Sequence, residues 1–262
     1  MSAPILVTGG TGTLGRLVTP LLREAGHSVR VLSRRGGRSG PGVEHVTADL
    51  VSGDGVDSAV HGTETVLHLA GGPKGDDQAT RNLVRAAQRA GVRHLVYISV
   101  IGADRVPLAW LRSKLDAERT IAGSGLPWTA LRAAQFHDLV LAVAEKMAKL
   151  PVVPAPGGLR FQPVDARDVA GRLVDLALGE PAGQVPDLAG PRVYEMDELI
   201  RGYLRAVGKR RLLLQVRLPG KVGRAYRAGA NLTLDGATGS RTWEAFLAER
   251  LPRRDPQCAT AR

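Results

Sequence analysis

The stretch ILVTGGTGTLGRLV at residues 5–18 constrains the fold more than any other part of the chain. A β-favouring apolar run passes directly into a turn containing Gly9, Gly12 and Gly15, and a helix-like apolar pattern follows without a linker. In such a turn the first glycine permits the sharp bend, the second lets the main chain approach a ligand, and the third lets the helix pack against the strand. Because a helix N-terminus presents unpaired N–H groups and the positive end of its dipole, this motif predicts a phosphate-binding site.

Strand-like and helix-like segments alternate through the first half of the chain. This alternation predicts the α/β class, with a Rossmann-like, doubly wound parallel sheet covered by helices on both faces. Gly26, Gly91 and Gly123 are expected at helix C-termini, where glycine adopts a left-handed backbone at low cost. Strands are expected to begin at residues 4, 28, 43, 65, 94 and 127, and helices to cover 13–25, 54–61, 76–91, 108–123 and 136–149.

The pattern changes after about residue 150, where LPVVPAPGG is rich in proline and glycine. Two further helices are expected near 165–179 and 195–207. Added segments beyond the carboxyl ends of the strands usually build the substrate side of such folds. We therefore expect three regions: a nucleotide-binding Rossmann-like core at 1–150, a smaller α/β substrate-side region at 151–250 that partly completes the core, and a flexible tail at 251–262.

The formal net charge of +11 raises the question of a nucleic-acid partner. The basic residues are scattered, with only short clusters at 33–35, 209–211 and 253–254, and aromatic residues make up 4%, too few for a stacking platform. Nucleic acid is therefore not expected as the main partner. No apolar run is long enough to span a membrane, the first strand leaves no room for a signal peptide, and Cys258 is the single cysteine, so a cytoplasmic protein is expected.

The end of the second expected strand indicates which dinucleotide the chain prefers. An acidic side chain there would hold a ribose 2′-hydroxyl, whereas a basic one would accept a 2′-phosphate. Ser33, Arg34 and Arg35 occupy this position, and guanidinium groups suit phosphate through paired, charge-assisted hydrogen bonds. The sequence thus favours NADP over NAD, unless both arginines merely face solvent.

Two later strand ends carry further candidate cofactor contacts. Asp49 and Leu50 follow the third strand, and Ala70, Gly71 and Gly72 follow the fourth. The glycines would again let the main chain approach a ligand closely, and Asp49 could accept a hydrogen bond from the adenine amino group. A turn-forming or helix-capping role for Asp49 is the alternative.

The glycine turn, with Thr8 ahead of it, resembles the short-chain dehydrogenase/reductase superfamily. The stretches RSKLDAE, SGLPWTALRAAQFHD, QPVDARDVA and GANLTLDGATGSRTWEAFL narrow the resemblance to the atypical, NmrA-like branch, which includes quinone and dye reductases, isoflavone-reductase-like enzymes and nucleotide-sensing regulators. The resemblance covers the chain to about residue 250. It implies an NADP (NADPH) cofactor and adds to its contacts Thr8, Thr13, Leu14, Ser99, Lys114 and Ala133.

The superfamily's usual chemistry uses a Tyr-x-x-x-Lys pair on one helix face. In WLRSKLDAER, Lys114 is in place, but Trp110 stands where the tyrosine would be, and an indole has no usefully titrating proton. Lys114 is expected to position the cofactor and stabilise developing negative charge, although an exposed pair with Glu118 is an alternative. After the sixth strand, Phe136 could form an apolar wall and His137 could donate a proton, or simply begin a helix.

These residues favour an NADPH-dependent reductase that transfers hydride to a quinone-like or other conjugated aromatic or carbonyl acceptor. Lys114 and His137 are the candidate catalytic residues, and Trp110, Phe136 and His137 are the candidate substrate contacts. Asp165 and Asp168 fit a helix start better than a metal site. The missing tyrosine favours an alternative function, that of an NADP-sensing regulator without catalysis. It is evidence against a sugar-nucleotide epimerase or dehydratase. The expected state is a monomer or homodimer.

Overall fold

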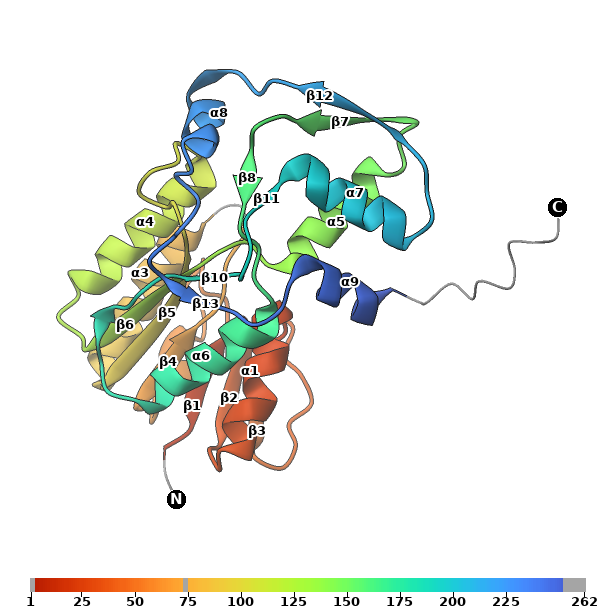
Figure 1. Ribbon diagram of the computed structural model, residues 1–262. Coiled ribbons are helices and arrows are strands. Elements are labelled where there is room, and N and C mark those ends of the chain that lie inside the picture. Colours follow the sequence, from red (N-terminus) through yellow and green to blue (C-terminus); the bar gives the residue numbers. More distant parts are fainter. Residues whose placement is uncertain (1–2, 73–74, 252–262) are drawn as a thin grey trace.

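The computed structural model describes residues 3–72 and 75–251 and has a large parallel sheet at its centre (Figure 1). Within these residues the nine-stranded sheet runs in the order β13-β10-β6-β5-β4-β1-β2-β3, with β9 beside β6. The crossover between β1 and β4 is the Rossmann arrangement, so the predicted fold class is confirmed. The strands are β1 (Ile5–Thr8), β2 (Val29–Ser33), β3 (Val43–Thr47), β4 (Thr65–His68), β5 (His94–Val100), β6 (Trp128–Ala133), β9 (Gly183–Gln184), β10 (Leu188–Ala189) and β13 (Ala237–Thr238).

Helices cover both faces of this sheet. On one face, α1 (Thr13–Glu24) and α6 (Ala166–Leu178) share a buried apolar cluster with the strands. On the other face, α2 (Val56–Val60), α3 (Asp76–Ala90) and α4 (Ala109–Ala122) form a second cluster. This double covering explains why the central strands, such as Ile5–Thr8, are buried along their whole length and read as continuous apolar runs.

All three glycines predicted to lie at helix C-termini do so, and two of them have the expected left-handed backbone. Gly26 and Gly91 have φ angles of +85° and +68°, in the left-handed region that glycine favours. Gly123 is the C-cap of α4, as expected, but its φ is −83°, and the left-handed position falls two residues later, at Gly125, with φ +75°. The turn after α4 thus closes later than the glycine pattern indicates.

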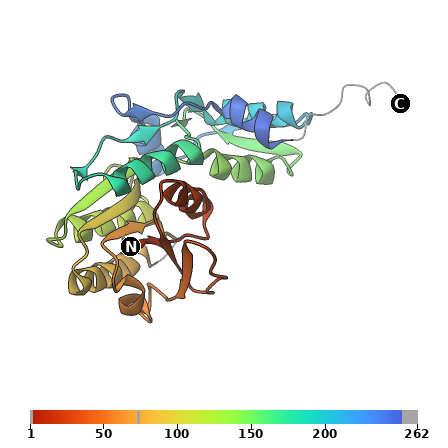
Figure 2. The ribbon, with the colours of Figure 1, turned by 90° about the horizontal axis from the view of Figure 1, so that it is seen from below.

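The remaining elements form a smaller layer beside the sheet, which Figure 2 shows projecting past the core. Its apolar cluster joins three helices with the inner face of a two-stranded parallel ribbon, and a short antiparallel pair, β8 with β11, connects it to the core. These elements are α5 (His137–Met147), β7 (Val152–Pro156), β8 (Arg160–Phe161), β11 (Tyr194–Glu195), α7 (Met196–Ala206), β12 (Leu212–Val216), α8 (Gly220–Arg227) and α9 (Trp243–Arg250).

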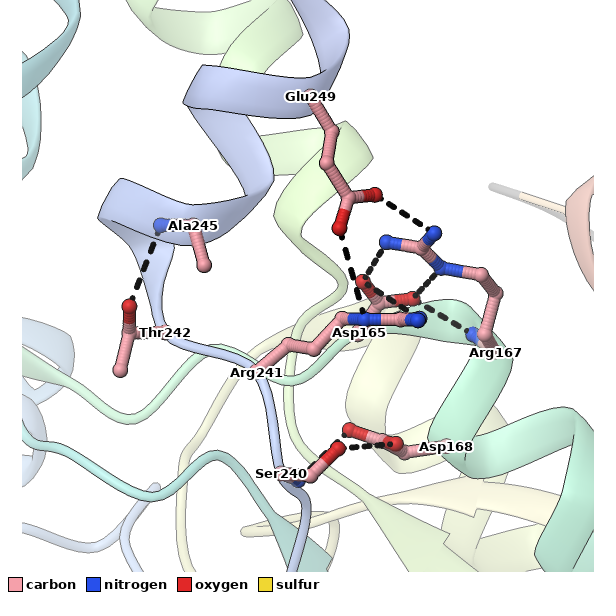
Figure 3. Close-up of polar contacts among 8 residues, drawn as sticks. All are labelled: Asp165, Arg167, Asp168, Ser240, Arg241, Thr242, Ala245 and Glu249. Carbon is pink, nitrogen blue, oxygen red and sulfur yellow. Dashed lines mark hydrogen bonds and ion pairs between the residues drawn. The ribbon is translucent and has the colours of Figure 1, made fainter.

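A polar cluster ties the start of α6 to the segment that leads into α9 (Figure 3). Asp165 caps α6 through a 2.8 Å hydrogen bond from the Arg167 main-chain N–H, which confirms its expected capping role. The Arg167 guanidinium also pairs with Asp165 and, at 2.7 Å, with Glu249 of α9. Asp168 instead accepts hydrogen bonds from the main chain and hydroxyl of Ser240. The cluster therefore fixes the smaller layer against the core.

Candidate active site

The glycine turn forms one end of the candidate site. Gly9 has a φ of +69°, and a Cβ placed on it would lie 2.7 Å from the main-chain nitrogen of Ala70. Gly12 is the N-cap of α1, and its N–H donates to the Gly9 carbonyl at 2.9 Å. A Cβ on Gly15 would collide with the main chain of Gly9 and Gly10. Positions 9 and 15 therefore require glycine, and the turn leaves the α1 N-terminus open to a ligand.

A cavity of about 420 Å³ opens from this turn along the carboxyl ends of β1, β2 and β4. Its wall combines bare main chain from the glycines with apolar side chains such as Leu32 and Ala79. The cavity thus has the mixed polar and apolar lining of a small-molecule site. Nine residues expected to contact a cofactor lie on its wall: Gly9, Gly12, Ser33, Arg34, Asp49, Leu50, Ala70, Gly71 and Gly72.

Other expected cofactor residues lie around this cavity without lining it. Thr8 and Leu14 are buried behind the turn, Thr13 is exposed in the first turn of α1, and Ala133 is buried at the end of β6. Ser99 is buried near the end of β5, and its hydroxyl has no hydrogen-bond partner among the described residues. Their cofactor contacts stay predictions.

The two arginines after β2 differ in position. Both side chains are exposed, but Arg34 lies on the cavity wall and Arg35 does not. Within the described residues neither forms an ion pair, and the Ser33 hydroxyl donates to the Gly36 carbonyl at 2.7 Å. Asp49 also lies on the cavity wall. Its carboxylate accepts a 2.8 Å hydrogen bond from the Val51 N–H, so Asp49 has the turn-forming role that the sequence offered as the alternative.

Lys114 is buried on α4 and is held by a residue that the sequence reasoning missed. Its Nζ lies 3.0 Å from Oδ2 of Asp76, in the first turn of α3. The other Asp76 oxygen accepts a 2.7 Å hydrogen bond from the Gly72 N–H, and a Cβ on Gly71 would lie 2.8 Å from the ammonium. Asp76 thus joins the lysine to the glycine pair after β4, which lines the cavity.

The expected alternative for Lys114, an exposed pair with Glu118, is wrong. Glu118 instead accepts hydrogen bonds of 2.9 and 2.7 Å from the Arg132 guanidinium of β6. The hydrogen bonds to Glu118, together with the charges of Glu118 and Asp104, raise the pKa of Arg132. The Glu118–Arg132 pair joins α4 to β6 one helical turn C-terminal to Lys114.

Tyr97 on β5 lies beneath the lysine. The Nζ of Lys114 is 5.4 Å from the centre of the Tyr97 ring, within the range of a cation–π contact. The ring is fully buried, and burial together with the carboxylates of Asp76 and Glu118 raises the pKa of its hydroxyl. Tyr97 therefore supports the ammonium and is not placed to exchange a proton with a substrate.

A chain of buried hydrogen bonds continues from Asp76 to the glycine turn. The Ala70 N–H donates to the Thr8 hydroxyl, which lies 2.7 Å from Nδ1 of His68, and Nε2 of His68 lies 3.1 Å from the Thr80 hydroxyl. The Thr80 hydroxyl donates to the Asp76 carbonyl. One proton arrangement satisfies the whole chain: Thr8 donates to Nδ1, and a neutral His68 donates from Nε2.

We expect this histidine to make the protein sensitive to acid. Burial, with a smaller contribution from the Lys114 charge, lowers the pKa of His68 from 6.5 to about 3. Below its ordinary pKa the unfolded chain binds the proton and the folded chain does not, so stability falls as the pH drops from 6.5 toward 3. Between pH 7 and pH 5 this group should lower the free energy of unfolding by about 2 kcal/mol, measured by urea denaturation.

The His68→Gln variant should lose that part of the pH dependence. His94 and His137, whose pKa values burial also lowers, account for the part that remains. The exposed His61→Gln variant is the matched control and should keep the wild-type difference. An unchanged pH dependence in His68→Gln would contradict the assignment.

His137 does not reach the cavity. Its ring is fully buried, lies 5.8 Å from the Trp243 ring and 5.1 Å from the Phe246 ring between their centres, and has no hydrogen-bond partner among the described residues. Burial lowers its pKa. These contacts give His137 a packing role at the start of α5 and no path to a substrate in the described cavity.

The other two candidate substrate contacts remain predictions. Trp110 is half-buried on the first turn of α4, four residues before Lys114, so both side chains lie on one face of the helix. Phe136 is the N-cap of α5 and packs partly against the main apolar core.

Comparisons with known proteins agree with this geometry. A family model described as NAD(P)H-binding matches residues 9–177. The (4-alkanoyl-5-oxo-2,5-dihydrofuran-3-yl)methyl phosphate reductase of Streptomyces griseus is 31% identical, over 90% of this chain and 89% of its own. The NAD(P)H azoreductase of Xenophilus azovorans is 29% identical, over 78% and 74%. The crystal structure of an NADPH-dependent quinone oxidoreductase from Escherichia coli, complexed with NADPH, has a TM-score of 0.80 at 21% identity, over 94% of this chain and 99% of that one.

The fold and the cavity define a dinucleotide-binding protein of the Rossmann class. The chain belongs to the NAD(P)H-binding family, and the matched region contains the glycine turn, both arginines after β2, Asp76 and Lys114. The resemblance to atypical short-chain dehydrogenase/reductases is thereby confirmed, as is the expectation of a nicotinamide dinucleotide cofactor. The reductases among its relatives agree with the expected class of enzyme.

Proposed function

We propose that the protein is an NADPH-dependent reductase that transfers hydride to a conjugated acceptor, either a quinone-like aromatic or an unsaturated carbonyl compound. The observation that carries the proposal is the placement of a buried, carboxylate-held ammonium, Lys114, beside the glycines that line the dinucleotide cavity. The named activities of the relatives support it, since they act on a quinone, an azo compound and an oxo-dihydrofuran.

The residues of the cavity fit a dinucleotide on physical grounds. Bare main chain at Gly9 and Gly12, next to the N-terminus of α1, would hold a diphosphate, because no side chain keeps it at a distance. Arg34, exposed on the wall and unpaired among the described residues, would hold a 2′-phosphate. Asp49 and Leu50 would contact the adenine side of the cavity.

Lys114 would then hold the nicotinamide half in place. A bound NADPH supplies the hydride. An ammonium has three donors, of which Asp76 takes one, so two remain for a ribose hydroxyl and for the oxygen that gains negative charge in the acceptor. Since Trp110 cannot donate a useful proton and Tyr97 and His137 are enclosed, we assign the final protonation to water.

Trp110 is the observation that favours a second candidate, an NADP-sensing regulator without catalysis. The same cavity and arginine would serve a sensor, which has no need of a proton donor at that position. The two candidates therefore differ in turnover and not in binding. An epimerase or dehydratase would need an active-site base of the tyrosine kind, which Trp110 does not supply.

Purified protein with NADPH and a panel of quinones, azo dyes and unsaturated lactones would separate these functions. Oxidation of NADPH that depends on the acceptor, followed by absorbance at 340 nm, supports the reductase. Tight binding by calorimetry without oxidation supports the sensor. No binding of either nicotinamide dinucleotide would contradict both.

We expect the Trp110→Phe variant to retain turnover within about threefold, because an aromatic wall is preserved and no proton passes through the indole. Steady-state kinetics with the best acceptor, together with NADPH affinity, measure this. A variant that binds NADPH normally but does not turn over would give Trp110 a chemical role.

Among the described helices, none combines the length and apolarity that crossing a membrane requires. A cytoplasmic location and a monomeric or homodimeric state remain part of this proposal.

A further inference from the structure

The outer face of the ribbon formed by β7 and β12 is apolar at every position. The two strands pair in parallel, so that Leu212, Leu214 and Val216 lie on the same face as their partners on β7, Val152, Pro154 and Pro156. The opposite face packs inward, where Val153 and Ala155 are fully buried in the cluster of the smaller layer. The outer face, in contrast, is exposed at Val152, Leu212 and Leu214 and partly exposed at Pro154 and Pro156.

The leucines of this face are unusually exposed. Leu212 is 69% exposed and Leu214 56% exposed, and Val152 on the neighbouring strand is 42% exposed. Leu150 and Leu218, just outside the two strands in sequence, are also exposed, at 45% and 37%. A contiguous apolar surface of this kind marks a contact with another phase or molecule, whereas scattered apolar side chains do not.

Exposed cations that form no ion pair within the described residues lie before and after β12. From residue 209 to residue 234 the chain has no acidic residue, and within the described part of the molecule no ion pair neutralises these cations. The sequence cluster at 209–211, which the proposed reaction does not use, directly precedes β12. The exposed basic side chains are Lys209, Arg210, Arg211, Arg217, Lys221 and Arg224.

We propose that this face, the cationic ribbon, binds peripherally to anionic lipid bilayers. Its leucines, valines and prolines would enter the boundary between headgroups and acyl chains, while the lysines and arginines at the two ends of β12 contact anionic headgroups. Long basic side chains suit this arrangement because their stems cover apolar surface and their charges stay in water. A conjugated, lipophilic acceptor in the bilayer would then lie near the enzyme.

The charges on the ribbon favour an anionic bilayer over a second copy of the chain as its binding partner. Antiparallel pairing of two β12 strands about Leu214 would place Arg211 of each copy near Arg217 of the other, and like charges at an interface are unfavourable. A bilayer also accommodates the unpaired edge of β12, because its polar main-chain groups would stay at headgroup level.

Cosedimentation with large unilamellar vesicles tests the proposal directly. We expect the full-length protein to bind vesicles of phosphatidylcholine with 30% phosphatidylglycerol and not vesicles of phosphatidylcholine alone, with binding lost in 1 M salt. The Arg210→Gln/Arg211→Gln variant should bind about 30-fold more weakly, at about 1 kcal/mol per charge. The Leu212→Thr/Leu214→Thr variant should bind at least roughly tenfold more weakly.

Matched variants show whether binding depends on this surface or only on the protein's total charge and exposed apolar area. Arg85→Gln/Arg119→Gln removes two exposed charges from α3 and α4, and Leu178→Thr removes an exposed leucine from α6, and both should bind as wild type does. All variants should keep the wild-type melting temperature and the wild-type activity measured without vesicles.

Three results would overturn the proposal. These are absence of binding to the anionic vesicles, equal loss in the matched control variants, and a wild-type dimer in sedimentation velocity that the Leu212→Thr/Leu214→Thr variant converts to a monomer. The last result would assign the cationic ribbon to a contact between two copies. Because the vesicle assay needs no turnover, its failure would leave the proposed reductase function untouched.

Discussion

Lys114→Met should lower kcat/KM for NADPH-dependent reduction by roughly 100- to 1000-fold, the usual cost of removing one positioned donor from a developing negative charge. The physical reason is the placement of Nζ, which is 3.0 Å from Asp76, rests over the Tyr97 ring and lies against Gly71. Methionine has a similar length and no charge. Steady-state kinetics with the best acceptor, and calorimetry with NADPH, measure the change.

The stability of this variant requires its own control. Removing the ammonium leaves Asp76, whose side chain is 8% exposed, as a nearly buried charge without its partner, which costs about 3–5 kcal/mol. The Lys114→Met/Asp76→Asn double variant should recover most of that stability, because the uncompensated charge is removed, but none of the activity. Recovery of both would show that the lysine acts only through folding.

Two single variants complete the test. Lys146→Met, at an exposed position on α5, should have wild-type kinetics. Asp76→Asn should raise the KM for NADPH more than it lowers kcat, because the lysine stays present but is less firmly placed. Turnover by Lys114→Met within twofold of wild type would remove Lys114 from the proposed mechanism.

The sequence predicts the first half of the fold closely because each element there is marked locally. The expected helix at 76–91 corresponds to Asp76–Ala90, and the strand expected from residue 94 corresponds to His94–Val100. Buried parallel strands give continuous apolar runs, and glycines mark the turns between elements. In the second half only the helices carry such marks: those expected near 165–179 and 195–207 correspond to Ala166–Leu178 and Met196–Ala206. Strands of two residues, such as Leu188–Ala189, form only because the rest of the sheet pairs with them.

Site residues could be predicted where a single sequence segment contains the motif. They could not be predicted where segments distant in sequence come together. Lys114 follows from the WLRSKLDAER pattern, whereas its partner Asp76 lies on another helix and was missed. An acidic pair, Asp76 and Asp77, at the expected helix start four residues after Gly72 was the available signal. His137 was expected to face a substrate, but the rings that enclose it come from Trp243 and Phe246, about a hundred residues later in the chain.

Charge at the end of β2 should set the choice between the two nicotinamide dinucleotides, and Arg34→Glu should reverse it. We expect the Kd for NADPH to rise about 100-fold, because a charge-assisted contact to the 2′-phosphate is lost and a like charge replaces it. The Kd for NADH should change less than about threefold or improve, because a carboxylate there can accept from the 2′-hydroxyl. Calorimetric titration with both cofactors measures the ratio.

Arg35→Glu is the matched control for this reversal, since it makes the same charge change one residue away, at an exposed position outside the cavity wall. It should shift the NADPH affinity by less than about tenfold, through the general field alone, which added salt screens. If Arg34→Glu weakened NADPH and NADH equally, the 2′-phosphate would be recognised elsewhere. If Arg35→Glu reproduced the full reversal, the guanidinium that holds the phosphate would be the one outside the wall, and the loop after β2 would have to turn toward the cavity when the cofactor binds.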